Sequence, residues 1–359
     1  MVGLADTVVN EARDRVRAAV VNSGTTWPDQ RVTINLAPST LPKSGSHYDL
    51  AIGLAVFVAK QLVPVDAVRD VAFIGELALD GRLRAVRGVL PATIAAADAG
   101  FVRVFVPECH VEEAELVEGV QVVGVRSLRQ AVALLTDQPE PDDPPVPPLS
   151  GPDAGDVWGG GGRAGRLDVA DVAGQEDSRA ALVVAAAGGH HLLMTGPPGI
   201  GKTMLAQRLP GLLPPLTRAQ SLEVSAVHSL AGVLGDVPLV ERPPFVDPHH
   251  TASAVAVVGG GQRGIRPGAL SLAHRGVLFL DEASNGKRTS FLKEVTDEDE
   301  DEAAWRERAT GAGNASGGLS GVHPDGAGHA GRGHAADLPV SAAVEVSQGQ
   351  GGRDRASAP

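Results

Sequence analysis

Cysteine is nearly absent from this chain of 359 residues, which contains Cys109 alone. A single thiol cannot form an intramolecular disulfide or a cysteine-rich zinc site, and this usage fits a reducing compartment. Aromatic residues make up only 3% of the chain, although 43% of its residues are hydrophobic. We therefore expect a folded protein whose cores are filled mainly by alanine, valine and leucine.

Long apolar runs are also missing. The longest, residues 50–59, is far shorter than the ~20 residues that a membrane-spanning helix requires. Asp6 and Glu11 stand where a secretory signal needs a basic start and an apolar run. We therefore expect a cytoplasmic protein without a membrane-spanning segment.

The chain has no excess of positive charge, since its net charge is −12. Nucleic-acid-binding proteins commonly carry a basic patch, so this balance disfavours DNA as a partner. It does not exclude DNA, because a ring can present a few basic pore residues on an acidic body.

Composition divides the chain into four regions. Residues 1–136 alternate between helical and strand periodicity and predict a compact α/β or α+β domain. Residues 137–166 are rich in proline, glycine and aspartate and predict a linker. Residues 167–283 predict a second α/β domain, whereas residues 284–359, which are rich in glycine and acids, predict a disordered tail.

Apolar periodicity predicts the main elements of the two domains. Helices are expected at residues 6–24, 49–62 and 175–187. Strands are expected at residues 32–36, 73–79, 102–106 and 192–195, with a tight turn at Asp80-Gly81.

A glycine-rich loop follows the predicted strand 192–195. Its residues match G-x-x-x-x-G-K-[ST] at every position: Gly196, Pro197, Pro198, Gly199, Ile200, Gly201, Lys202 and Thr203. Glycines let backbone N–H groups surround an anion, and the helix that follows offers its positive N-terminus. Lys202 would reach the β- and γ-phosphates and Thr203 would bind Mg²⁺. The loop predicts a P-loop site for Mg-ATP.

A strand that ends in two acids completes such a site. Residues 277–280 are apolar and are followed by Asp281 and Glu282. Asp281 would hold Mg²⁺, while Glu282 would orient and polarise the water that attacks the γ-phosphate. With Lys202 as the second catalytic residue, the pair favours hydrolysis over binding alone. The alternative is a buried strand with an acidic exit loop.

Histidines do not form a convincing metal site. His249 and His250 are adjacent, and adjacent side chains do not face one way on a strand or helix. We expect an exposed, ordered loop there. Three more histidines between residues 311 and 334 are irregularly spaced and lack thiolate partners, which is typical of a solvated coil.

Several segments together resemble one family, the YifB/ComM family of magnesium-chelatase-like AAA+ ATPases. Those in the second half are Asp171-Val172-Ala173-Gly174-Gln175-Glu176, Gly188-Gly189-His190, the P-loop, Pro248-His249-His250-Thr251-Ala252-Ser253, and residues 266–274 and 276–282. Residues 2–6, 15–19, 22–24 and 41–45 resemble the Lon-protease-like domain of that family, which has the ribosomal S5 domain 2-like fold. The resemblance covers about residues 2–283.

The resemblance implies an ATP-driven homo-hexameric motor with Mg²⁺. It implies DNA as a partner, because ComM members act as branch-migration helicases in natural transformation. It also implies that Val172, Gly174 and Gln175 lie near the adenine.

The N-terminal region departs from the pattern of Lon-type proteases, which cut with a Ser–Lys dyad. Aligning residues 42–45 with the protease motif puts His47 at the nucleophile position, and the later motif puts Leu90 at the lysine position. Ser46 is one residue off and lacks a base. We expect a non-proteolytic scaffold or docking domain.

A second departure follows the acids. The family continues into a sensor residue, an arginine finger, a sensor arginine and a helical domain, and residue 284 onward matches none of them. We expect a truncated or frameshifted chain, an incomplete AAA+ core without its sensor strand, and impaired hydrolysis and assembly. Two alternatives stay open: the motor subunit of a metal chelatase, and a degenerate nucleotide-binding protein without turnover.

Overall fold

The helices of the first part of the chain form where apolar residues recur at helical spacing. In α1 (Thr7–Asn22) the residues Ala12, Val16, Ala19 and Val20 all lie on the buried face. In α2 (Asp49–Ala59) apolar residues occupy most positions, and most are buried. The two expected helices are confirmed, although α2 ends at Ala59 because the chain turns at the left-handed residue Gln61.

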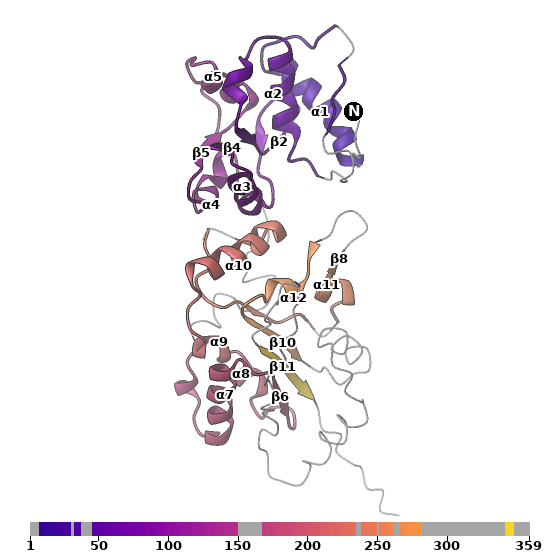
Figure 1. The fold of residues 1–359 in the computed structure, drawn as a ribbon. Coiled ribbons are helices and arrows are strands. Elements are labelled where there is room, and N and C mark those ends of the chain that lie inside the picture. Colours follow the sequence, from indigo (N-terminus) through magenta and orange to yellow (C-terminus); the bar gives the residue numbers. More distant parts are fainter. Residues whose placement is uncertain are drawn as a thin grey trace, which may run out of the picture. The chain divides into compact units, whose positions relative to one another are not determined.

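The computed structural model describes residues 7–29, 32–36, 45–149, 167–234, 238–249, 251–260, 266–281 and 342–347 (Figure 1). The chain divides into two units. The first unit comprises Met1–Gly151 and Ser225–Leu239, and the second comprises Pro152–Val224 and Val240–Pro359. Of the expected second domain, residues 167–224 and 240–283 belong to the second unit, and residues 225–239 are grouped with the first.

The first unit is built around a three-stranded parallel sheet in the order β1-β4-β5. A short antiparallel pair is formed by β2 and β3, and β2 packs against α1 and α2. After α2 its elements are η1 (Val65–Val68), β1 (Val71–Phe73), β2 (Glu76–Leu77), β3 (Leu83–Arg84), α3 (Val89–Asp98), β4 (Arg103–Pro107), η2 (Glu108–His110), α4 (Val111–Ala114), β5 (Gln121–Val125) and α5 (Leu128–Leu135).

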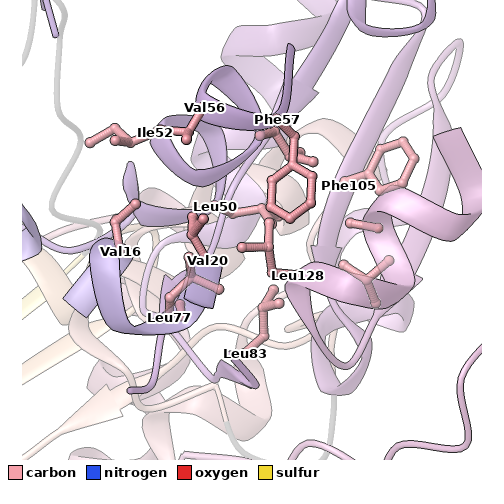
Figure 2. Packing of buried hydrophobic residues seen from close by; sticks show 14 of the residues in the cluster. Val16, Val20, Leu50, Ile52, Val56, Phe57, Leu77, Leu83, Phe105 and Leu128 are labelled. Carbon is pink, nitrogen blue, oxygen red and sulfur yellow. The ribbon is translucent and has the colours of Figure 1, made fainter. Parts of the chain in front are cut away.

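Its core lies where α1, α2 and α5 meet the strands. Figure 2 shows Leu50 and Phe57 of α2 beside Phe105 of β4 and Leu128 of α5. Phe105 also packs against Phe73 of β1, with ring centroids 5.1 Å apart. Burial of these side chains stabilises the unit, each contributing about 1.5–3 kcal/mol.

The second unit continues the alternation of strand and helix. Its elements are η4 (Val169–Asp171), α7 (Glu176–Gly188), β6 (Leu192–Thr195), α8 (Lys202–Ala206), α9 (Leu209–Leu212), α10 (Arg218–Ala231), β7 (Phe245–Val246), α11 (Ala254–Val258), β8 (Gly259–Gly260), β9 (Arg266–Pro267), α12 (Ala269–Leu272), β10 (Val277–Asp281) and β11 (Ala342–Ser347). The expected helix and strand before the P-loop are confirmed as α7 and β6. The boundary between the units falls within α10, after Val224.

A four-stranded sheet in the order β6-β11-β10-β7 is the centre of the second unit (Figure 1). All three pairings are parallel. The expectation of an incomplete core without the family's sensor strand stays a prediction. The expectation that residues 342–347 are disordered is wrong, because they form β11 between β6 and β10. This stretch is free of glycine and proline, and it finds hydrogen-bonding partners on both edges, whereas the remaining residues of the expected tail lie outside the described part of the chain.

Two of the expected strands differ from the structure. Residues 32–36 form no strand, although Ile34 and Leu36 pack against the core. Residues 73–79 are split between β1 and β2, since the backbone of Gly75 pairs instead with His47 and Leu50. The strand expected at residues 102–106 is confirmed as β4.

The beginning of the expected linker packs on the first unit. Asp143 is buried and accepts hydrogen bonds from Ser127 and Arg129, while Arg126 donates to its backbone carbonyl. Val146 belongs to the core. The ordered part of this unit therefore runs well past residue 137. No described helix is long and apolar enough to cross a membrane.

Candidate functional site

The P-loop connects β6 to α8, as the motif requires. Thr195 ends the strand and Lys202 begins the helix. Gly199 and Gly201 have φ values of +82° and +96°, in the region that side chains rarely adopt. The glycines of the pattern are therefore explained by the backbone path of the loop.

Lys202 extends over the loop that precedes it. Its Nζ donates hydrogen bonds to the carbonyl oxygens of Gly196 at 2.7 Å and Pro197 at 3.1 Å. Thr203 is exposed in the first turn of α8. The ammonium and the hydroxyl thus lie at the loop, where a phosphate chain and its metal would be held.

Gln175 lies against the P-loop from another element. Its backbone is left-handed, with φ of +51°, and its Nε2 donates to the carbonyl oxygen of Ile200 at 2.9 Å. Gly174 is also left-handed, and Val172 is buried in the core of the second unit. The three residues expected near the adenine therefore belong to a segment that reaches the loop through Gln175.

Asp281 is brought to the same edge of the sheet. Because β6, β11 and β10 are parallel, their carboxyl ends share one edge, and Asp281 is level with Val346 of β11 and through it with Met194 of β6. Two strand spacings separate the backbones of Asp281 and Met194 by about 10 Å. The half-buried Asp281 thus lies across from the P-loop, while Glu282 is outside the described residues.

The donor set fits a nucleotide-bound Mg²⁺ better than a protein-held metal. Among the described residues no group of three or more His, Cys, Asp or Glu side chains could hold a metal ion. Mg²⁺ with phosphates needs only one or two protein oxygens, which Thr203 and Asp281 would supply. His249 bonds instead to Thr251, with Nδ1 and Oγ1 2.8 Å apart.

Two sets of contacts around the site have no motif that would reveal them. Arg208 donates to the carbonyl oxygens of Asp168 and Met204 and so ties α8 to η4. Arg275, just before β10, donates to Glu223 of α10 at 2.6 Å, and this contact lowers the pKa of Glu223. Each pairing joins positions more than 35 residues apart, except Arg208 with Met204, and local periodicity does not predict such partners.

The first unit shows what occupies the former protease positions. Leu90 is completely buried, and Ser46 donates to the carboxylate of Glu76. His47 donates from Nε2 to the carbonyl oxygen of Arg87 at 2.7 Å. A buried alkyl chain stands where the lysine is needed, and the absence of peptidase activity stays a prediction.

Comparisons with known proteins agree with this architecture. The model of the family "Magnesium chelatase, subunit ChlI" matches residues 168–297, and "Subunit ChlI of Mg-chelatase" matches residues 1–110. YifB of Escherichia coli is 41% identical over 292 residues, and the competence protein ComM of Haemophilus influenzae is 39% identical over 288. The chain belongs to the YifB/ComM family. It is therefore one of the magnesium-chelatase-like AAA+ proteins.

The YifB/ComM relatives are longer than this chain. An uncharacterized protein of Mycobacterium tuberculosis is 51% identical over 296 residues, which are 79% of this chain and 54% of that relative. The matches to YifB and ComM cover 81% and 80% of this chain and 55% of each relative. The chain thus spans about half the length of the curated relatives it matches.

A weaker similarity to Lon proteases supports the expected Lon-like nature of the N-terminal part. Lon protease 2 of Bacillus subtilis is 25% identical over 118 residues, or 33% of this chain. The archaeal Lon protease of Methanocaldococcus jannaschii is 29% identical over 109 residues. The mixed α/β fold of the first unit is therefore combined with a Lon-like sequence.

Proposed function

We propose that this chain binds Mg-ATP at the P-loop of the second unit. The observation that carries the proposal is the loop itself, in which left-handed glycines lead from β6 to Lys202 and Thr203 at the start of α8. Gln175 packs on the loop, and Asp281 ends a strand on the same edge of the sheet. A helix N-terminus preceded by such a loop is a ready site for phosphate.

Each residue has a separate task in this proposal. Lys202 exchanges its bonds to loop carbonyls for bonds to the β- and γ-phosphates, and Thr203 and Asp281 hold the metal. Mg²⁺ supplies charge neutralisation on the phosphates when bound. Glu282, the next residue after Asp281, orients and polarises the attacking water.

Replacing Lys202 tests the binding site directly. Lys202→Ala should weaken Mg-ATP binding by roughly 1.5–3 kcal/mol, the value of a charge-assisted hydrogen bond, or about 10- to 150-fold. Lys60→Ala is the matched control, because Lys60 bonds Thr25 and Thr26 in the first unit. Isothermal titration measures both affinities, and equal affinity in Lys202→Ala and the native chain would contradict the assignment.

We further propose that ATP hydrolysis by this family serves DNA remodelling, with assembly into a homo-hexamer. Membership in the family of ComM, which is named a competence protein, supports this proposal. The motor subunit of a metal chelatase is the second candidate, because the matching family models carry that name. The matches to YifB and ComM, which cover 81% and 80% of this chain, favour the former. A binding protein without turnover is the third.

Phosphate release separates these candidates. We expect the present chain to bind ATP weakly, to hydrolyse it slowly and not to form a stable hexamer, and a chain extended to the length of its relatives to hydrolyse ATP faster with branched DNA. Stimulation by a metal-free porphyrin instead of DNA would favour the chelatase. Fast DNA-stimulated hydrolysis by a hexamer of the present chain would contradict the expected impairment.

A further inference from the structure

The second half of α10 and the turn after it form part of the first unit. We call its described residues, 225–234, the docked segment. Ser229 in this segment is buried, and its backbone carbonyl accepts a hydrogen bond from the amide of Gly88 at 3.0 Å. Its hydroxyl donates to Oε1 of Glu113 on α4. The segment is thus held by one main-chain and one side-chain bond at the same residue.

Glu113 is a buried carboxylate with three donors. Besides Ser229, the amide of Leu90 donates to Oε1 at 3.0 Å, and Nδ1 of His110 lies 2.8 Å from Oε2. Burial raises the pKa of Glu113, but the bonds from His110 and Ser229 outweigh it and hold the pKa below its ordinary value. A buried charge is costly unless it is bonded in this way. Loss of any one donor should therefore destabilise the buried charge of Glu113.

The His110 ring is oriented by contacts on both sides. Nε2 lies 3.2 Å from the amide nitrogen of Val86, and Nδ1 faces Oε2 of Glu113. Val86, His110, Glu113 and Ser229 thus form one continuous chain of hydrogen bonds. It runs from the turn before α3 to the docked segment.

Two glycines allow the segment to approach closely. Gly88 has φ of +74°, and a Cβ at this position would lie 3.1 Å from Cδ1 of Leu230. Gly232 has φ of +75°, and a Cβ there would lie 2.6 Å from Nε of Arg87. The turn at residues 86–90 and the turn that ends α10 are therefore matched in shape as well as in hydrogen bonding.

We propose that residues 86–90 and Glu113 are an interaction site of the first unit whose occupant is the docked segment of the same chain. The amide of Leu90, the position aligned with the catalytic lysine of Lon-type proteases, is one of the donors that orient Glu113. The residues around Leu90 thus hold the docked segment, and Glu113 is the residue that binds it through Ser229. This inference is independent of nucleotide binding.

Hydrogen exchange of the full chain tests the anchor. In Ser229→Ala and in Glu113→Gln, the amides of residues 229–234 should exchange about tenfold faster, the size expected for one lost bond to a buried charge. Glu112→Gln, which alters the exposed neighbour on α4, is the matched control and should leave this exchange unchanged. Mg-ATP affinity should be the same in all three variants.

Two results would overturn the proposal. In one, the docked segment exchanges at the native rate in both Ser229→Ala and Glu113→Gln. In the other, α2 and β4 lose protection to the same extent as the segment, which would make Glu113 a general core residue of the first unit.

Discussion

The P-loop of the second unit keeps every residue of its pattern, whereas the first unit carries neither member of the Ser–Lys dyad at the aligned positions. The residues of the two motifs are also distributed differently along the chain. The P-loop is a contiguous stretch whose backbone conformation requires Gly199 and Gly201. The dyad joins two side chains from separate elements, and at its positions His47 bonds a carbonyl and Leu90 is buried. A fold can therefore persist after the chemistry of its side chains has been replaced.

A lysine at position 90, which aligns with the catalytic lysine of Lon-type proteases, should have the largest effect on stability. Leu90→Lys places an ammonium in a completely buried position, and Glu113 already has three donors. We expect a loss of about 3 kcal/mol or more in the free energy of unfolding, and no peptidase activity on casein. Urea denaturation measures the loss. Leu79→Lys is the control, because Leu79 is 59% exposed, and equal stability of the two variants would contradict the burial argument.

A glycine exchange in the P-loop should have an intermediate effect on ATP affinity. Gly199 and Gly24 have φ values of +82° and +90°, and a Cβ at either position would meet nothing within 4 Å. Alanine therefore costs only backbone strain, about 1–2 kcal/mol at each position. Gly199→Ala should weaken Mg-ATP binding about 5- to 30-fold, whereas Gly24→Ala should leave it unchanged. Equal titration curves for the two variants would show that the loop conformation is not needed.

Removing the contacts that hold residues 137–149 on the first unit should have the smallest effect, and it should affect stability alone. Asp143→Asn should lower the free energy of unfolding by about 1 kcal/mol at pH 7 and leave ATP affinity unchanged. Burial raises the pKa of Asp143, but the hydrogen bonds from Arg129 and Ser127 lower it by more than burial raises it. The folded pKa therefore lies below the ordinary 3.8. The stabilisation is therefore complete well above pH 3.8 and is lost as the pH falls through the lower folded pKa.

Denaturation across the pH range checks this assignment. The difference between the native chain and Asp143→Asn should be constant above about pH 5 and shrink below about pH 4. Asp142→Asn, on the exposed neighbour, should follow the native chain. A difference that grows in acid would contradict the assignment.

Local pattern predicted much of this protein. The spacing of Val16 and Val20 predicted α1, and the P-loop pattern predicted the succession of β6, loop and α8. These features depend on conformational preferences and on burial of one helical face, both of which act within a few residues. The same holds for the acid at the end of β10.

Long-range pairing was decided only by the tertiary structure. The sequence contains no signal that Ser229 meets Glu113, that Glu223 meets Arg275, or that residues 342–347 enter the sheet between β6 and β10. Many carboxylates and many short apolar stretches could form such contacts, and only the folded chain selects one partner for each. The sequence by itself therefore determined the glycine-rich loop between β6 and α8, while the tertiary structure decided which distant residues pair with one another, because hydrogen-bond partners depend on distance in space and not along the chain.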